Sequence, residues 1–373
     1  MKYLAVLGRQ PEISIAELEA IYGVGRYQTS FSGRSGALVQ VLDSSKDVLM
    51  PPSIDRFGGV LKFAIKLEQM PLEFLAKLPE GKLTIGVSDY SKNASRRTAN
   101  MEALKLKRIL VRHGRSVRVV ENKDAVLSTA TSLHNGLSGK NERKVELIKI
   151  NDEWYRVIGV QDIDAYTKRD RVRPARDAKV GMLPPKLAQI LINLCGPLPK
   201  NATILDPFCG TGVVLQEALL MGYRAYGTDV SERMIEYSQK NLEWLKINNF
   251  QVSVGDATSF KWSQPIDAVA CEGYLGKPFT RIPNRMELKE QKQECKAIVL
   301  GFLKNLVGQI KKDTPVVIAM PAWLRENHKY ERLDILDEID KLGYNVSNKS
   351  REGLLYCRPG QIVARDIIIL RKR

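Results

Sequence analysis

Four short apolar stretches between residues 202 and 272 are each followed by an acidic residue, and this pattern constrains the fold more than any other feature. The stretch ATIL precedes Asp206, RAYGT precedes Asp229, QVSVG precedes Asp256 and IDAVAC precedes Glu272. Helix-like segments separate the stretches, and such alternation is typical of a parallel sheet. Because ligands of open α/β sheets bind where the strands end, the sequence predicts a ligand site lined by carboxylates.

The first of these strands runs into a glycine-bearing turn, DPFCGTG at residues 206–212. Gly210 and Gly212 let the backbone approach a ligand closely. Asp229 lies 23 residues after Asp206, where an acid accepts hydrogen bonds from ribose hydroxyls. A dinucleotide site normally shows G-x-G-x-x-G, and a carboxylate at Asp206 would repel its pyrophosphate. The same carboxylate suits the sulfonium and ammonium groups of S-adenosylmethionine, so the sequence predicts this cofactor.

Basic residues outnumber acidic residues in this chain of 373 residues, 58 Lys and Arg against 42 Asp and Glu, and the net charge is +16. This excess favours a polyanionic partner, because counterion release contributes to the affinity. A basic proteome or a solubility device would give the same charge, and charge alone does not separate RNA from DNA or from an acidic membrane. The chain has no apolar run of eighteen residues, so we expect no membrane-spanning helix.

The cysteines do not indicate a disulfide framework or a zinc site. There are five, an odd number, without a C-x-x-C pair: Cys195, Cys209, Cys271, Cys295 and Cys357. We therefore predict no metal site and a reduced, cytoplasmic protein. Residues 1–20 hold one Lys and a short apolar run, which favours a first strand and a helix over a signal peptide.

The length predicts two or three domains. Residues 1–60 alternate short strand-like and helix-like segments, and residues 61–163 repeat that pattern with a more basic surface. Residues 164–183 are rich in Lys and Arg, contain Pro174 and lack periodicity, so they predict a basic linker. Residues 184–373 hold the alternating strands and helices and form the predicted α/β domain.

A basic, glycine-containing loop, STATSLHNGLSGKNERK at residues 128–144, joins two predicted elements of the second region. Lys, Arg and Asn beside glycines suit contacts with phosphates and single strands. A solvated basic loop explains the same residues equally well. The candidate RNA contacts in this loop are His134, Asn135, Lys140, Arg143 and Lys144.

Five segments together carry a resemblance to a known family: YLAVLGRQPEISIAELEA, LKLKRILVRHGRSVRVV, YTKRDRVRPARDAKVGMLPPKLAQILINL, LDPFCGTGVVLQEAL and LYCRPGQIVARDIIILRK. The chain resembles the THUMP-containing tRNA guanine-N2 methyltransferases, archaeal and eukaryotic enzymes that act on the guanosine at tRNA position ten. The resemblance implies an α/β protein of three parts. These are a ferredoxin-like unit at residues 1–60, a THUMP domain at 61–163 that grips the tRNA acceptor end, and a class I, Rossmann-like methyltransferase domain at 184–373.

The resemblance also implies the roles of individual residues. Residues 206–212 match the family's first cofactor motif, Asp229 its ribose-binding acid and Asp256 its adenine-contacting acid. The segment Pro-Pro-Lys at residues 184–186 falls where the family's chain wraps the cofactor. The expected cofactor-binding residues are Asp206, Pro207, Phe208, Cys209, Gly210, Thr211, Gly212, Asp229, Val230, Asp256, Ala257 and Glu272. The expected RNA-binding residues of the linker are Lys168, Arg169, Arg173 and Arg176.

The fourth acidic strand end departs from the family pattern, which is Asp-Pro-Pro-Tyr followed by Gly. Here Glu272 stands on the acid, Gly273 and Tyr274 on the prolines and Leu275 on the aromatic residue, while Gly276 remains. A guanine amine is a poor nucleophile because its lone pair is delocalised into the ring, so the enzyme must accept hydrogen bonds from its N–H groups. An aromatic ring stacks on a base taken out of its helix. Glu272 and Tyr274 are therefore the expected catalytic residues.

Several interpretations of this motif stay open. The motif fits a variant active enzyme, a family member with a changed target nucleotide, and a tRNA-binding protein that no longer transfers methyl. Glu272 alone is also explained as a strand-end carboxylate that pairs with Lys277 or Arg281. A DNA adenine-N6 methyltransferase uses a similar motif, although the THUMP-like half argues against it.

We predict an enzyme that uses S-adenosylmethionine to form N2-methylguanosine in tRNA, at position 10. Its expected partner is tRNA, and we expect neither a bound metal ion nor an association with membranes. The resemblance leaves open whether a small zinc-binding activator protein is needed, as in the eukaryotic relatives.

Overall fold

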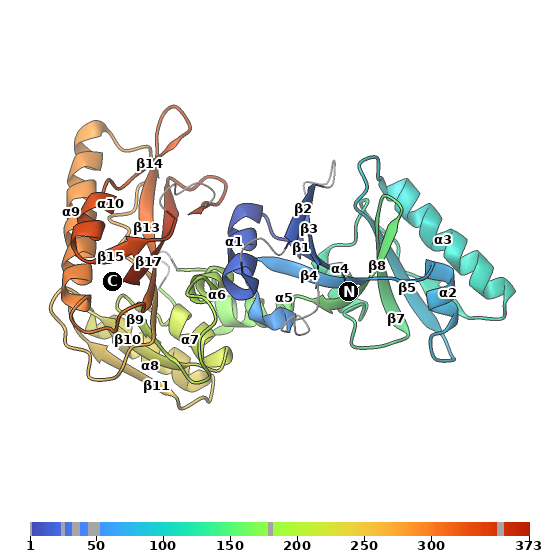
Figure 1. Ribbon diagram of the computed structural model, residues 1–373, viewed down its shortest axis with the longest axis horizontal. Coiled ribbons are helices and arrows are strands. Elements are labelled where there is room, and N and C mark those ends of the chain that lie inside the picture. Colours follow the sequence, from blue (N-terminus) through green and yellow to red (C-terminus); the bar gives the residue numbers. More distant parts are fainter. Residues whose placement is uncertain (1, 24–26, 32–37, 44–52, 178–181, 349–353) are drawn as a thin grey trace. The chain divides into compact units, whose positions relative to one another are not determined.

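The computed structural model describes residues 2–23, 27–31, 38–43, 53–177, 182–348 and 354–373 (Figure 1). The chain divides into two compact units. The N-terminal unit comprises residues 1–15 and 22–166, and the C-terminal unit comprises residues 16–21 and 167–373.

One sheet forms the framework of the N-terminal unit. In the described residues it has eight strands in the order β2-β3-β1-β4-β8-β7-β5-β6. The strands are β1 (Lys2–Leu7), β2 (Tyr27–Phe31), β3 (Leu38–Asp43), β4 (Val60–Lys66), β5 (Leu83–Asp89), β6 (Val117–Val119), β7 (Lys144–Ile150) and β8 (Glu153–Val160). Strand β1 pairs with β4, so the strands before and after the predicted domain boundary at residue 60 belong to one continuous sheet. The ferredoxin-like unit and the THUMP domain, with their boundary at this residue, stay predictions.

Short helices accompany this sheet, and α3 shows how the sequence forms them. The helical elements are α1 (Pro11–Tyr22), the 3-10 turn η1 (Ile54–Arg56), α2 (Pro71–Ala76), α3 (Arg96–Arg112), α4 (Thr129–His134) and α5 (Ile163–Thr167). Helix α3 starts with a capping box, in which Ser95 Oγ accepts from the N–H of Thr98 at 3.1 Å. Its buried residues recur at helical spacing and face the core: Ala99, Ala103, Leu106 and Leu110.

The segment that we predicted as an irregular linker, residues 164–183, begins as a helix. Helix α5 continues directly into a π-helical turn, η2 (Lys168–Val172). Tyr166 is buried, and its hydroxyl donates to the carbonyl oxygen of Phe57 at 3.3 Å. A single apolar anchor in a run of charged residues gives no helical period, which is why the sequence did not predict this helix.

A buried ion pair crosses the sheet of the N-terminal unit. Lys62 Nζ on β4 lies 2.6 Å from Glu146 Oε1 on β7, and neither side chain is more than 2% exposed. Lys62 Nζ also donates to the carbonyl oxygen of Leu127 at 2.8 Å and to Ser132 Oγ at 2.9 Å. Ser88 Oγ on β5 donates to the same Glu146 oxygen at 2.6 Å. Since buried charges need such partners, this network ties three strands together.

The C-terminal unit is a second sheet whose strands alternate with helices. Among the described residues it has nine strands: β9 (Thr203–Asp206), β10 (Arg224–Asp229), β11 (Phe250–Val254), β12 (Ala268–Glu272), β13 (Pro315–Leu324), β14 (Tyr330–Arg332), β15 (Tyr344–Val346), β16 (Leu355–Tyr356) and β17 (Val363–Lys372). Its helices are α6 (Pro185–Leu194), α7 (Val213–Leu220), α8 (Glu232–Trp244), α9 (Arg285–Leu306) and α10 (Leu336–Lys341). No helix in the described parts of the chain is long and apolar enough to cross a membrane.

The strand order of this sheet is β11-β10-β9-β12-β13-β17-β15. In this order only β17 runs antiparallel to its neighbours. In Figure 1, α9 and α10 cover one face, while α6 and α7 lie on the other. Residues 315–323 of the central strand β13 are all buried, as expected for a strand covered on both faces. The predicted α/β class is confirmed for this unit, and its parallel strands β9, β10, β11 and β12 end at one edge.

Candidate functional site

The predicted row of strand-end carboxylates is present along this edge. Asp206, Asp229 and Glu272 are the last residues of the neighbouring strands β9, β10 and β12, and Asp256 follows β11. Asp206 lies opposite Gly227 of β10, and Leu205 lies opposite Val269 of β12. Asp229 and Glu272 therefore each extend two residues, about 6–7 Å, beyond the level of Asp206. Asp206 forms the floor between them.

Asp206 is a buried acid among other acids. It is 2% exposed, and its Oδ1 accepts one backbone hydrogen bond, from Phe208 N–H at 3.2 Å. Burial raises the pKa of Asp206 well above its usual range, and the nearby charges of Asp229 and Glu272 raise it further. A cationic ligand beside this carboxylate would offset both effects. The buried carboxyl group of Asp206, with acidic residues beside it, thus fits the sulfonium and ammonium groups of S-adenosylmethionine.

The glycine turn after β9 is held against Asp229. Gly210 has a φ of +49° and donates its N–H to Asp229 Oδ2 at 2.9 Å, while Ser231 N–H donates to Oδ1 at 2.9 Å. A Cβ at Gly210 would meet nothing within 4 Å, so that side of the turn is open. A Cβ at Gly212, whose φ is +82°, would lie 2.5 Å from Ser238 Oγ. Gly210 therefore borders free space and Gly212 a packed helix.

The remaining predicted cofactor residues differ in exposure. Val230 is 72% exposed and offers an apolar surface beside Asp229, which suits the face of a purine ring. Asp256 is exposed, and hydrogen bonds to its Oδ1 from the N–H and hydroxyl of Thr258 lower its pKa. Cys209 is buried, and burial raises the pKa of its thiol well above the usual value, so it is a packing residue and not a thiolate.

Other residues of the turn are held by their neighbours. Phe208 packs edge-on against Phe302 at 5.4 Å between ring centroids. The carbonyl oxygen of Pro207 accepts from Thr228 Oγ1 at 3.5 Å, and Ala257 is buried. Asn241 Nδ2 donates at 2.9 Å to the carbonyl oxygens of Thr211 and of Ala175. Asn241 on α8, which our sequence reasoning missed, therefore links the cofactor turn to the basic linker.

Glu272 pairs with a residue far along the chain. Arg365 Nε on β17 donates to Glu272 Oε1 at 2.7 Å. Burial raises the pKa of Glu272, and Arg365 opposes that rise. The alternative that Glu272 pairs with Lys277 or Arg281 is wrong, because Arg281 pairs instead with Glu287 at 2.7 Å and Lys277 is exposed. Glu272 is thus a largely buried carboxylate with one oxygen paired to Arg365.

The turn after Glu272 is packed on α9. Tyr274 is half-buried, and its hydroxyl donates to Glu294 Oε1 at 3.2 Å. Gly276 has a φ of +83°, and a Cβ there would lie 2.3 Å from Gln291 Oε1. That oxygen accepts from the N–H of Lys277 at 2.5 Å. The turn is therefore a specific structure that places an aromatic ring two residues beyond the carboxylate.

Two linker residues predicted to contact RNA have other surroundings in the structure. Arg173 is 3% exposed, so its predicted contact with RNA does not fit the structure. Its Nη2 donates to the sulfur of Met182 at 2.8 Å. Arg169 Nε donates to Glu217 Oε1 at 2.7 Å, and this acid is buried on α7. Both cations lie inside the C-terminal unit because the linker packs onto it.

Other predicted RNA contacts are accessible. Lys168 Nζ lies 5.7 Å from the ring centre of Trp244, and Arg176 is exposed. In the N-terminal unit, the exposed cations of the basic loop are Lys140, Arg143 and Lys144. His134 Nε2 lies 3.1 Å from an Asp164 oxygen, and Asn135 Oδ1 accepts from Arg118 at 3.0 Å. Their contacts with RNA stay predictions.

The segment at residues 184–186 opens helix α6. Pro184 occupies the position before the helix, and Pro185 is its first residue. Burial lowers the pKa of Lys186. The wrapping of a cofactor by this segment stays a prediction.

Known proteins share much of this sequence. A family model described as a methyltransferase domain matches residues 198–331, and one described as a DNA methylase matches residues 116–240. The tRNA (guanine(10)-N2)-dimethyltransferases of Methanothermobacter thermautotrophicus and Pyrococcus abyssi are 41% identical over 144 residues and 39% identical over 194. A probable tRNA (guanine(10)-N2)-dimethyltransferase of Methanothermococcus thermolithotrophicus is 38% identical over 139 residues, which are 36% of this chain and 78% of that protein. The chain belongs to the tRNA (guanine(10)-N2)-dimethyltransferase family.

The likeness to these dimethyltransferases is partial in length. The alignments with the first two span 39% and 51% of this chain and 40% and 50% of theirs. The chain thus spans about half the length, or less, of these relatives. The crystal structure of TrmN from Thermus thermophilus, 14% identical, covers 100% of both chains with a TM-score of 0.53. That likeness shows a shared Rossmann-like methyltransferase fold.

Proposed function

We propose that this member of the dimethyltransferase family transfers a methyl group from S-adenosylmethionine to the exocyclic N2 atom of a guanosine in tRNA, at position 10. The observation that carries the proposal is Glu272, a carboxylate acceptor at the end of the strand beside the cofactor turn. The names of the relatives support the substrate and also a second methyl transfer to the same amine.

The chemistry requires a hydrogen-bond acceptor more than a strong base. Glu272 Oε1 is engaged by Arg365, and the second oxygen is available to accept from an amine N–H group. That hydrogen bond localises the nitrogen lone pair for in-line attack. The bound cofactor supplies an electrophilic methyl group on a sulfonium sulfur, which keeps the electron pair of the broken bond. The proton that the amine loses passes to Glu272 or to water, so charge and atoms balance.

The ring of Tyr274 gives the flipped guanine a surface on which to stack. Its hydroxyl is held by Glu294, which fixes the ring two residues beyond the acceptor. Stacking of this kind offsets the energy of taking a base out of its helix. Asp206 would face the cationic groups of the cofactor, Asp229 its ribose and Asp256 its adenine.

The N-terminal unit, with its exposed basic loop, would dock the tRNA acceptor end in the manner of a THUMP domain. The linker cations Lys168 and Arg176 would add further contacts with the RNA backbone. The cytoplasmic location stays a prediction, and the question whether a zinc-binding activator protein is needed stays open.

The decisive experiment incubates the protein with tRNA transcripts and labelled S-adenosylmethionine, followed by digestion and mass spectrometry. We expect N2-methylguanosine or its dimethyl form at position 10. Transfer to another guanosine would support the changed-target interpretation. In a parallel incubation with DNA in place of tRNA, transfer to adenine would revive the DNA methylase alternative. Binding of tRNA and cofactor without transfer would favour a non-catalytic tRNA-binding protein.

A matched pair of variants tests the acceptor. Glu272→Ala should abolish transfer, while calorimetry should show nearly unchanged cofactor affinity, because the cofactor charges face Asp206. Glu272→Gln keeps the shape and one acceptor oxygen, so we expect weak residual transfer. Full activity in Glu272→Ala would sink the mechanism.

A further inference from the structure

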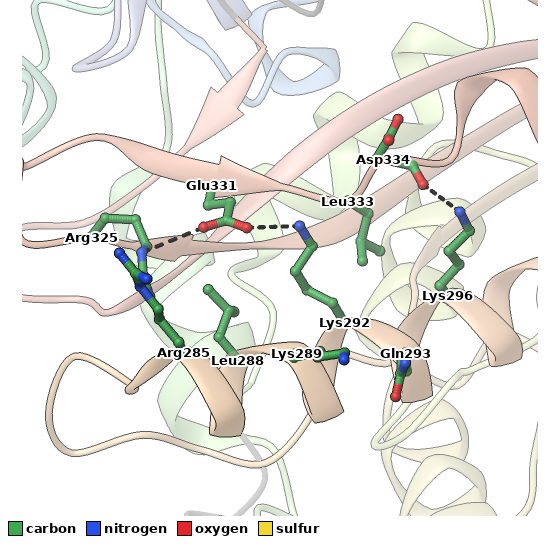
Figure 2. Close-up of a pocket in the computed structure, with 10 residues that line it drawn as sticks. All are labelled: Arg285, Leu288, Lys289, Lys292, Gln293, Lys296, Arg325, Glu331, Leu333 and Asp334. Atoms are coloured by element: carbon green, nitrogen blue, oxygen red, sulfur yellow. Dashed lines mark hydrogen bonds and ion pairs between the residues drawn. The ribbon is translucent and has the colours of Figure 1, made fainter.

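We propose that a groove between helix α9 and strand β14 binds the phosphate backbone of the RNA whose target base enters the Glu272 site. The groove has a volume of about 490 Å³ and is open to solvent. Figure 2 shows it, with α9 on one side and β14 with its flanking residues on the other. This inference rests on the proposed function, since it assigns a second contact to the same substrate.

The groove is lined mainly by cations. Five lining side chains are basic, while two are acidic, Glu331 and Asp334. The basic residues are Arg285, Lys289, Lys292 and Lys296 of α9 and Arg325, which directly follows β13. A concave surface with this excess attracts a polyanion, and the net charge of the chain, +16, acts in the same direction.

The sequence of α9 separates its charges onto two faces. At 100° per residue, the four cations of α9 that line the groove fall within an arc of about 60°. The acids Glu287, Glu290 and Glu294 fall within a similar arc on the opposite side. The buried residues Leu288 and Cys295 lie on the face between the two arcs that packs against the sheet. An ordinary solvated helix mixes its charges, so this segregation favours a dedicated cationic face.

Internal ion pairs hold part of the groove and leave the rest for a ligand. Glu331 accepts from Lys292 at 2.7 Å and lies 3.4 Å from Arg325 (Figure 2). Lys296 donates to the carbonyl oxygen of Asp334 and to Glu338. Within the described residues, Arg285 and Lys289 have no ion-pair partner, and both are exposed. Phosphates that reach these two cations displace only water and counterions.

The groove lies at the edge of the sheet that carries the target site. Strand β12 ends at Glu272, and the loop that follows leads into the first turn of α9. Arg325 donates to the carbonyl oxygen of Pro283 in that loop at 3.1 Å, so the groove wall and the catalytic turn are linked. Strand β14 pairs with the last residues of β13, which runs parallel to β12 and ends at the same edge. An RNA strand that places a base at Glu272 therefore has a route for its flanking phosphates.

The test compares tRNA binding over a range of salt concentrations, without cofactor, for the full chain and for Arg285→Ala/Lys289→Ala. Loss of two phosphate contacts should lower the slope of log Kd against log salt by about 1.8 and weaken binding at 0.1 M salt by as much as about 60-fold. Alanine favours helix, and both positions are exposed, so the fold should be retained. The matched control is Lys311→Ala/Lys312→Ala, an exposed pair before the start of β13 at the opposite edge. It should keep the parent slope, and so should the charge-conserving variant Arg285→Lys/Lys289→Arg.

The outcomes separate this inference from the proposed function. If Arg285→Ala/Lys289→Ala leaves both the salt dependence and the affinity for tRNA unchanged, the groove does not bind the RNA backbone. This holds even if the parent protein methylates tRNA. A groove that docks an acidic protein surface instead would give that same result. A reduced slope in a protein that methylates no tRNA would support the groove and reject the activity. An equal loss in the control pair would mean diffuse attraction and also reject the groove.

Discussion

Arg365 Nε lies 2.7 Å from Glu272 Oε1, although the two residues are 93 positions apart in the sequence. The pair forms across β13, because Glu272 stands opposite Ala319 on one side and Arg365 stands opposite Pro321 on the other. Both side chains are largely buried. The charge of the proposed acceptor thus depends on a strand that the catalytic motif does not contain.

We expect Arg365→Met to slow methyl transfer most at low pH. Burial raises the pKa of Glu272 and Arg365 opposes that rise, so removing the cation should raise the pKa further. Glu272 accepts hydrogen bonds fully only when ionised, so the acidic limb of the pH–rate profile should move to higher pH. Arg365→Lys keeps a cation beside Glu272, so its pH–rate profile should lie closer to that of the parent protein. A uniform loss at every pH would indicate a structural role instead.

Asp206→Asn should stabilise the cofactor-free protein and weaken cofactor binding. Asparagine keeps an oxygen for the Phe208 N–H and removes a buried charge that Asp229 and Glu272 repel. We expect a gain of about 0.5–2 kcal/mol in the free energy of unfolding, measured by thermal denaturation. Loss of a charged partner should weaken S-adenosylmethionine binding by about 10- to 100-fold, measured by calorimetry. In the parent protein this affinity should fall as pH drops through the raised pKa of Asp206.

Glu217 should make the stability of the C-terminal unit fall as pH rises from about 4.5 to 7. Burial raises the pKa of Glu217 from 4.5 to about 7, and its partner Arg169 only partly opposes this. The folded state then holds a proton that the unfolded state has lost, so stability is highest below the unfolded pKa. The slope should reach about 1.4 kcal/mol per pH unit at most. Glu217→Gln should lack this pH dependence. The measurement is the free energy of unfolding from denaturant titrations at several pH values. An equal dependence on pH in the two proteins would contradict the assignment.

Gly276→Ala should disrupt the catalytic turn, while Gly222→Ala serves as a matched control. Both glycines have a positive φ, +83° and +84°, so both variants share a backbone strain of about 1–2 kcal/mol. Only at Gly276 would the new Cβ collide, 2.3 Å from Gln291 Oε1. We expect a large fall in kcat for Gly276→Ala and a parent-like kcat for Gly222→Ala. Equal activities would show that the turn does not position Tyr274.

The sequence allowed the parallel strands and their carboxylate ends to be predicted, because both are local patterns. Apolar runs that end in Asp206, Asp229 and Glu272 need no knowledge of distant residues. The partner of Glu272 could not be predicted in this way. Sequence proximity favoured Lys277 and Arg281, whereas the strand order brings Arg365 across β13. Long-range ion pairs follow from topology, which charge spacing along the chain does not encode.

Burial of charge was the other limit of the sequence. A run of Lys and Arg predicts an exposed linker, yet Arg173 is buried and Arg169 pairs with a buried acid. In α3, Leu104 is apolar but 43% exposed, since small residues such as Ala99 and Ala103 form the buried face of the helix. Composition reveals which residues carry charge or apolar surface, and packing decides which of them meet water.

The ion pair between Lys62 and Glu146 has a consequence for how the first sheet assembles. A shift of β4 by one residue would turn Lys62 to the opposite face and leave Glu146 without its cation. The shifted arrangement would then leave the buried Glu146 carboxylate without a charged partner, at a cost of about 3–5 kcal/mol. The pair therefore favours the native alignment of β4 over shifted alignments in the unit that we expect to hold tRNA.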